Sequence, residues 1–174
     1  MVSVSVEPPS QVQRGMPLYP PLVVSCPNGQ YAFFQIVLID SHGRIADQQY
    51  IQGTLSVSPQ ALESTSHSSR GPKDFAVFPD LMIRRSGTFT IQVNAYQMDY
   101  QSMPPSMYHA ATAATREIRV RSSAVSEGRP CKSHQQLPRY PYNIFTRLAN
   151  HGSNLASSEA RLLDRLAQAG FAVQ

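Results

Sequence analysis

Residues 88–98 read Thr88-Phe-Thr-Ile-Gln-Val-Asn-Ala-Tyr-Gln-Met98, and polar and apolar side chains alternate from Thr88 to Ala95. Phe89, Ile91 and Val93 fall on every second position, with threonine, glutamine and asparagine between them. Because successive side chains of a β-strand point to opposite faces, this period of two predicts a strand with one buried and one polar face. A strand of this kind is typical of antiparallel sheets, so the stretch favours a mainly β protein.

Other short apolar runs on both sides of this strand predict a series of further strands, separated by Gly-, Pro- and Asn-containing turns. The run at 31–39 is so rich in aromatic and β-branched residues that we expect burial on both faces or nearly so. We expect a hairpin turn at 85–87 and a loop over 99–114. The remaining predicted strands lie at 2–6, 22–24, 50–57, in two pieces within 75–84, and at 115–120.

The ends of the chain are different in character from its middle. Residues 1–21 are proline-rich and predict an extended arm, whereas 58–74 and 122–156 have the composition of long irregular segments. A helix is predicted over 157–170, capped by Ser157 and Ser158 and closed by Gly170. Its apolar stripe is formed by Leu162, Leu163, Leu166 and Ala167. We therefore predict one domain over 1–174, a β-sandwich of the immunoglobulin-like kind at 22–121 with long loops and a C-terminal α-helix.

Charge is sparse and unevenly distributed. Only 15% of the 174 residues are charged, with a formal net charge of +4. Residues 1–80 carry four basic and six acidic side chains, whereas residues 116–147 alone carry seven basic and two acidic ones. An excess of this kind is compatible with a polyanionic partner, because Lys and Arg gain affinity by releasing phosphate counterions. It is equally compatible with a solvated basic face that keeps the protein soluble.

The motifs of common enzymes and metal sites do not occur in the sequence. There is no phosphate-binding G-x-x-x-x-G-K-[ST], no H-E-x-x-H, no C-x-x-C and no G-x-S-x-G. The five histidines are scattered through predicted loops, and Cys26 and Cys131 are expected to be free thiols. No apolar run is long enough to span a membrane, and no signal peptide is expected. We therefore expect no enzyme, cofactor, metal, membrane association or small-molecule substrate.

The segment from Phe75 to Ile91, Phe-Ala-Val-Phe-Pro-Asp-Leu-Met-Ile-Arg-Arg-Ser-Gly-Thr-Phe-Thr-Ile, resembles the signature of the velvet family of fungal regulators. That signature has a Phe-Pro-Asp-Leu centre, a basic residue, a turn glycine and an aromatic-led strand. Three weaker similarities follow in the family's order: Pro-Pro-Leu-Val-Val at 20–24, Gly-Thr-Leu at 53–55, and the closing helix at 158–173. The resemblance covers most of the chain, but only its central motif is specific.

The central motif also has a structural interpretation that is independent of the family. Pro79 fixes its own φ and restricts Phe78 to an extended conformation, which predicts a rigid bend. Asp80 can accept hydrogen bonds from nearby backbone amides, and Gly87 suits a turn with positive φ. We expect these four residues to shape a corner of the fold, with no direct functional contact.

The resemblance implies a Rel-homology-like β-sandwich that binds duplex DNA as a homodimer or as a heterodimer with another velvet protein. It further implies a nuclear regulator of fungal development, sporulation and secondary metabolism that can also shuttle through the cytoplasm.

One feature departs from the family. Velvet proteins normally carry a Lys- and Arg-rich stretch before the Pro-Pro segment, and that stretch contributes to DNA contact. Here residues 11–19 have Arg14 as their only charge. The candidate DNA-binding residues are therefore Arg14, Arg84, Arg85, Arg119 and Arg121, with support from Arg129 and Lys132.

The alternative hypothesis is an interaction module that dimerises with another velvet protein without touching DNA. The depleted basic stretch favours it, and so does the apolar arm at 2–6, which could add an edge strand to a partner.

Overall fold

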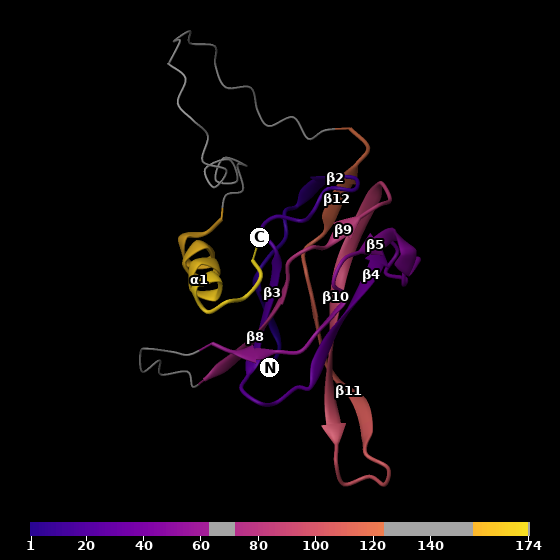
Figure 1. Ribbon diagram of the computed structural model, residues 1–174. Coiled ribbons are helices and arrows are strands. Elements are labelled where there is room, and N and C mark those ends of the chain that lie inside the picture. The colour runs from indigo at the N-terminus through magenta and orange to yellow at the C-terminus, as the bar shows by residue number, and fades with distance from the viewer. Residues whose placement is uncertain (63–71, 124–154, 174) are drawn as a thin grey trace.

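The computed structural model describes residues 1–62, 72–123 and 155–173, and most of this part of the chain is extended (Figure 1). Within it lie one α-helix, α1 (Ser157–Gln168), and one 3₁₀ turn, η1 (Gln48–Tyr50). The strands are β1 (Ser3–Val6), β2 (Gln11–Gln13), β3 (Leu22–Pro27), β4 (Phe33–Asp40), β5 (Ile51–Gln52), β6 (Ser56–Val57), β7 (Gln60–Ala61), β8 (Lys73–Phe78), β9 (Met82–Ile83), β10 (Gly87–Asp99), β11 (Ser106–Ala114) and β12 (Ile118–Arg121). A mainly β fold with a helix near the C-terminus is therefore confirmed.

The strands form two larger sheets and one small pair. The first sheet has the order β1-β3-β8-β7. The second sheet has the order β2-β12-β10-β4-β6, and β11 pairs with the distal part of β10. Strands β5 and β9 pair separately with each other. Apart from the parallel pair β2–β12, every pairing is antiparallel, as the half-buried pattern of 88–98 predicts.

The main core lies between the two larger sheets. Ile91 pairs with Leu38 and Val93 with Ile36, and all four side chains are buried. From the first sheet, Leu22, Val24, Ala76 and Phe78 enter the same cluster. The expectation that 31–39 is buried on both faces is wrong, because Phe33, Val37 and Ile39 lie on the outer face and stay partly exposed.

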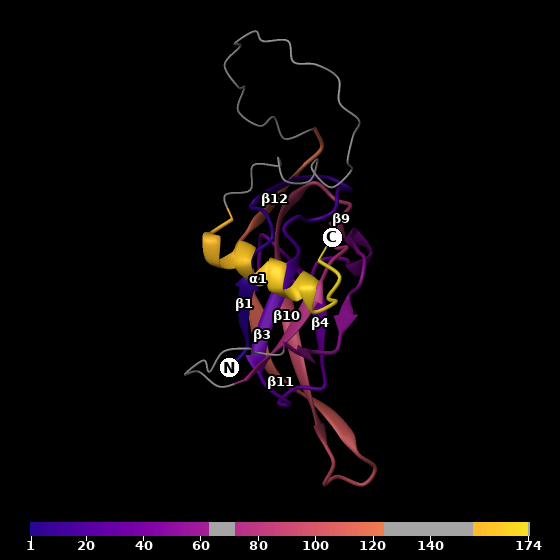
Figure 2. The same cartoon turned by 60° about the vertical axis from the view of Figure 1, so that its left-hand side comes forward.

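Helix α1 covers the outer face of the first sheet (Figure 2). Leu163 and Leu166 pack there in a second cluster with Val6, Val23 and Val77. The helix ends as predicted, with Gly170 at a φ of 86°. Its beginning differs from the prediction, because Ala156 occupies the N-cap position and the Glu159 carboxylate accepts the backbone N–H of Ala156 at 3.0 Å. None of the described helices is long and apolar enough to cross a membrane.

The strand expected at 50–57 is broken. The chain instead passes through η1 into β5, leaves the extended conformation at Gly53, where φ is 112°, and resumes as β6. Gly53 lies directly against the backbone of Asp80, and the N–H of Thr54 donates to Oδ1 of Asp80 at 2.7 Å. The interruption is therefore imposed by a residue that lies 26 positions beyond Thr54 in the sequence, so the local sequence pattern does not predict it.

Two expectations about connections are also wrong. Residues 106–114 form strand β11, which pairs with β10 along 92–99, so this part of the expected loop is a β-hairpin arm. The residues at 85–87 do not form a hairpin turn, because β9 pairs with β5 and the strands flanking the turn do not pair with each other.

The N-terminal arm is integrated into both sheets. The strand predicted at 2–6 is confirmed as β1, which pairs with β3, while Val2 and Val6 are buried. Strand β2 was not predicted and runs parallel to β12, so that Gln11 lies beside Arg119. The apolar side chains of the arm are therefore used within this chain, and this weakens the suggestion that they serve a partner.

We expect Asp74→Ala to lower the free energy of unfolding by about 2 kcal/mol. Asp74 is buried and accepts hydrogen bonds from the side-chain amide of Asn28 at 2.6 Å and from the N–H of Gly29 at 2.7 Å. Its loss leaves both donors of the β3–β4 turn without this acceptor. Urea denaturation measures the effect, with the exposed Asp164→Ala on α1 as a control that should change stability by less than about 0.5 kcal/mol. Equal unfolding midpoints for the two variants would contradict the assignment.

Candidate nucleic-acid interface

Five of the predicted DNA-binding residues lie at one end of the molecule, which we call the arginine end: Arg14, Arg84, Arg85, Arg119 and Arg121. Figure 1 shows β2, β9 and β12 gathered at this end, with the β10–β11 hairpin arm reaching away from it. All five side chains are exposed. They come from three separate segments of the chain, so the fold and not the sequence brings them together.

Strand β12 determines the direction of two of these arginines. Ile118 and Val120 are buried in the core, so the intervening Arg119 and Arg121 point outward. This alternation confirms the predicted orientation. Arg119 lies beside Thr88 on β10 and Gln11 on β2, which places it on the polar outer face of the second sheet.

Backbone hydrogen bonds fix the other segments to β12 and to η1. The N–H of Arg14 donates to the carbonyl of Arg121 at 2.8 Å, and this places the only charge of residues 11–19 at the end of β12. The N–H of Arg84 donates to the carbonyl of Tyr50 at 2.7 Å. Arg14 therefore retains a position beside the other cations although the basic stretch expected from the resemblance is missing.

Arg85 is held by an aromatic side chain that sequence reasoning missed. Its guanidinium carbon lies 5.0 Å from the centre of the Tyr50 ring, and its Nη1 donates to the Tyr50 hydroxyl at 3.3 Å. Stacking of this kind restricts the long arginine side chain while leaving most of its donors available. Tyr50 lies in no motif, so only the structure identifies this role.

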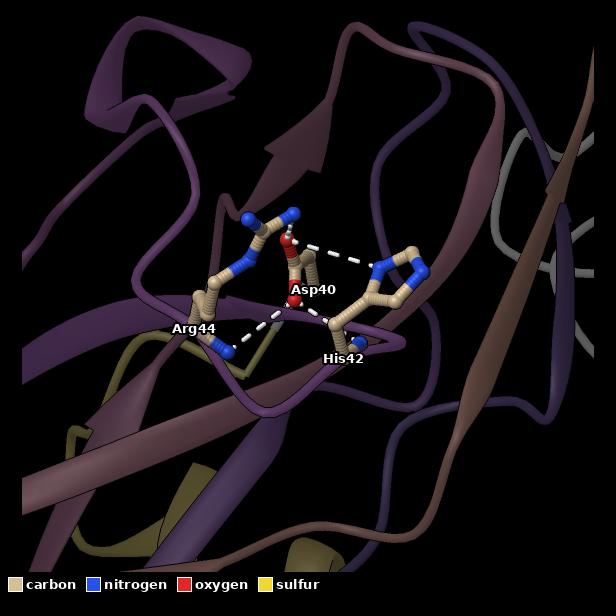
Figure 3. A network of polar contacts seen from close by, with 3 residues as sticks. All are labelled: Asp40, His42 and Arg44. Carbon is tan, nitrogen blue, oxygen red and sulfur yellow. Dashed lines mark hydrogen bonds and ion pairs between the residues drawn. The ribbon is translucent and has the colours of Figure 1, made fainter.

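A second missed element is the turn after β4 (Figure 3). Oδ1 of Asp40 accepts the backbone N–H groups of His42 at 2.8 Å and of Arg44 at 3.0 Å, and Oδ2 lies 3.4 Å from Nη2 of Arg44. The N–H of Arg44 lowers the pKa of Asp40 most, and the N–H of His42 lowers it further. Asp40 therefore remains a carboxylate and fixes the turn, with Gly43 at a φ of 75°.

An open groove of about 510 Å³ lies between this turn and the beginning of β10. Arg44, Arg85 and Tyr50 line it together with the carboxylates of Asp40 and Asp47, so guanidinium, hydroxyl and carboxylate groups border the same space. The groove extends the arginine end toward β4. Arg44 is paired with Asp40 in this groove, whereas Arg85 forms no ion pair among the described residues. The guanidinium of Arg85 is therefore suited to an anionic oxygen ligand, since guanidinium groups bind phosphate in bidentate geometry.

The five arginines of the arginine end form no ion pair within the described residues. Among the residues that the structure describes, the ion pairs are His42 and Arg44 with Asp40. The same residues contain no cluster of His, Cys, Asp and Glu that could hold a metal ion. Burial, and then the charge of Asp74, raise the pKa of the Cys26 thiol to about 11, so this buried cysteine stays protonated at neutral pH.

The residues of the structural motif lie at the end of β8, directly after it, and at the beginning of β10. Phe78 is buried in the main core, and Gly87 has a φ of 151°, with the Phe89 ring 3.2 Å from where a Cβ would stand. Asp80 differs from the prediction, because it accepts the N–H of Thr54, 26 residues earlier, and not that of a neighbour. Two of the segments that carry the family resemblance, at 53–55 and 75–91, thus contact each other.

Two predicted DNA-binding residues, Arg129 and Lys132, lie outside the described residues, as does Cys131. The comparisons with known proteins add no assignment: no model of a known protein family matches the chain, and no curated protein matches it either.

Proposed function

We propose that this chain is a velvet-like nuclear regulator of fungal development, sporulation and secondary metabolism, which binds duplex DNA through its arginine end as a homo- or heterodimer. In this proposal the two sheets form a Rel-homology-like sandwich, and the loops at one end of it face the nucleic acid.

The observation that carries the proposal is the grouping of five exposed arginines without a carboxylate partner among the described residues. Surface arginines usually lie among acidic side chains, whereas a nucleic-acid interface keeps them available for phosphate. The resemblance at 75–91 favours the same function on independent grounds, since it rests on Phe-Pro-Asp-Leu and the turn glycine.

The arrangement suggests a division of roles. Arg119 and Arg121 extend from a strand that pairs on both sides, so they suit phosphate contacts that set the register on the duplex. Arg85 is oriented by Tyr50 at the border of the groove, so it suits a contact that depends on the direction of its guanidinium group. Bidentate contact of arginine with a guanine edge is the commonest specific contact of this type.

Titration of DNA binding with salt tests the proposal. If all five arginines contact phosphate, affinity for duplex DNA should fall about 500-fold between about 50 and 200 mM salt. Fluorescence anisotropy with a labelled duplex measures this for the full chain. Absence of binding at the lower salt concentration would contradict direct DNA contact.

The second candidate is the interaction module that pairs with another velvet protein without contacting DNA. The observation that favours it is Arg14 as the only charge of residues 11–19. Complex formation with a velvet partner, together with no DNA binding by this chain alone, would favour this candidate over the first.

A further inference from the structure

Strand β11 stands out among the edge strands of the two larger sheets. The other edges are short: β1 has four residues, β2 three, and β6 and β7 two each. Strand β11 has nine residues and pairs with β10 on one side only. Among the described residues no backbone partner is found on its other side, so a long row of N–H and C=O groups is available there.

Two of the usual protections of such an edge, charged residues and prolines, are missing. From 100 to 115 the sequence contains no lysine, arginine, aspartate or glutamate, and no proline lies within β11. Proteins normally place charged residues or prolines on exposed edges to prevent pairing with another chain. An uncharged edge of this length is therefore suited to adding a strand from a partner.

The same arm also exposes large apolar side chains. Within the described residues seven such side chains are strongly exposed, and four of them belong to the arm: Tyr100 at 78%, Met103 at 96%, Met107 at 50% and Tyr108 at 48%. A cluster of exposed apolar side chains next to an unpaired edge indicates an interaction surface. Figure 1 shows the arm at the end of the molecule opposite to β2 and β12, so a partner here would leave the arginine end accessible.

We propose that the partner at this edge is a second copy of the same chain, paired antiparallel through β11. This inference rests on the dimer in the proposed function and names the strand through which that dimer forms. The pairing itself requires no DNA. Its basis is the self-complementarity of the strand. Two identical uncharged edges do not repel each other, and the order of large and small side chains permits close packing.

The register follows from the faces of β11. Pairing with β10 places Met107, Thr112 and Ala114 on the outer face, and Tyr108 and Ala113 on the inner face. An antiparallel pair of two copies in which Met107 meets Ala114 therefore also brings Tyr108 to Ala113, with matching faces. Each large side chain then lies opposite a small one, in both halves of the two-fold arrangement.

The bulge in β11 is compatible with this register. The pairing with β10 shifts between Ala95 and Tyr96, where Ala110 is the extra residue on β11. Both copies carry the same bulge next to the two-fold axis, so neither strand has an extra residue relative to the other. The ladder therefore keeps its register on both sides of the axis, with Ala110 beside Ala111 of the second copy.

Charge placed near the axis tests the inference. The full chain, measured without DNA by light scattering after size exclusion, should have twice its mass of 19.2 kDa. The exposed Ala110→Lys should weaken the dimer about tenfold or more, because like charges then face each other across the axis. Ser56→Lys is the matched control, since it adds the same charge to the exposed edge strand β6 and should leave the dimer unchanged.

A charge-exchange experiment makes the test specific. Ala110→Lys mixed with Ala110→Glu should restore association, whereas each variant alone remains weakened. Thermal unfolding of each variant distinguishes loss of pairing from loss of folding. A monomeric chain, a dimer insensitive to Ala110→Lys, or an equal effect of Ser56→Lys would overturn the inference. DNA binding is measured separately on the same variants, so failure of the dimer and failure of the proposed function remain distinguishable.

Discussion

Gly53→Ala should lower the free energy of unfolding by about 4 kcal/mol, the sum of two independent costs. The first cost is backbone strain, since Gly53 has a φ of 112°, which side-chain-bearing residues rarely adopt. The second cost is steric. A Cβ at this position would overlap the carbonyl oxygen of Asp80 and lie 2.8 Å from its carbonyl carbon. Backbone atoms cannot rotate away as a flexible side chain can, so Asp80 and its hydrogen bond to Thr54 would have to shift.

Gly43→Ala provides the matched control for this prediction. Gly43 also has positive φ, at 75°, but no heavy atom lies within 4 Å of the position of its Cβ. Only the conformational cost then remains, about 1 kcal/mol. Chemical denaturation of both variants measures the difference. If Gly53→Ala lowered the free energy of unfolding no more than Gly43→Ala does, this result would contradict the close contact between the 53–55 and 75–91 segments.

Arg119→Ala combined with Arg121→Ala should reduce affinity for duplex DNA about 100-fold at low salt. Each arginine that donates to a phosphate contributes about 1.5 kcal/mol, and the two together correspond to about two powers of ten. The slope of log affinity against log salt should become shallower by about 2, because two fewer counterions are released. Both side chains point away from the core between Ile118 and Val120, so the fold should not change.

Arg161→Ala combined with Arg165→Ala is the control for charge alone. These two arginines are exposed on α1, which lies on the outer face of the first sheet, away from the second sheet that carries Arg119. The control removes the same charge and should leave both the affinity and the salt slope nearly unchanged. Equal losses for the two double variants would mean that binding depends on net charge and would contradict an interface at the arginine end.

The elements that sequence predicts well are those whose signal is local. Strand β10 is predicted nearly to its ends because an alternating pattern persists over eight residues, from Thr88 to Ala95. The position of α1 followed from its leucine stripe and Gly170, and the bend at Pro79 from the fixed φ of proline. In each case the residues that specify the structure are within the element itself.

The elements that sequence predicts poorly depend on distant partners. Strand β11 consists mainly of alanine, threonine and serine with three large side chains, a composition with weak β-propensity, and it is extended because β10 offers a pairing edge. The break at Gly53 is due to Asp80, which lies in another segment.

The same reason applies to the candidate site. Each arginine could be found in the sequence, but their grouping depends on the parallel pairing of β2 with β12, which places Arg14 beside Arg121. Tyr50 and Arg44 belong to no motif and take their roles only from neighbours that the fold supplies.

The position of α1 has a consequence for the order of folding during synthesis. Strands β1, β3 and β8 leave the ribosome well before residues 155–173, so Val6, Val23 and Val77 are synthesised long before Leu163 and Leu166 can cover them. The nascent chain therefore presents an uncovered valine surface while translation continues through the intervening residues. That interval is when chaperone binding or aggregation competes most strongly with completion of the second cluster.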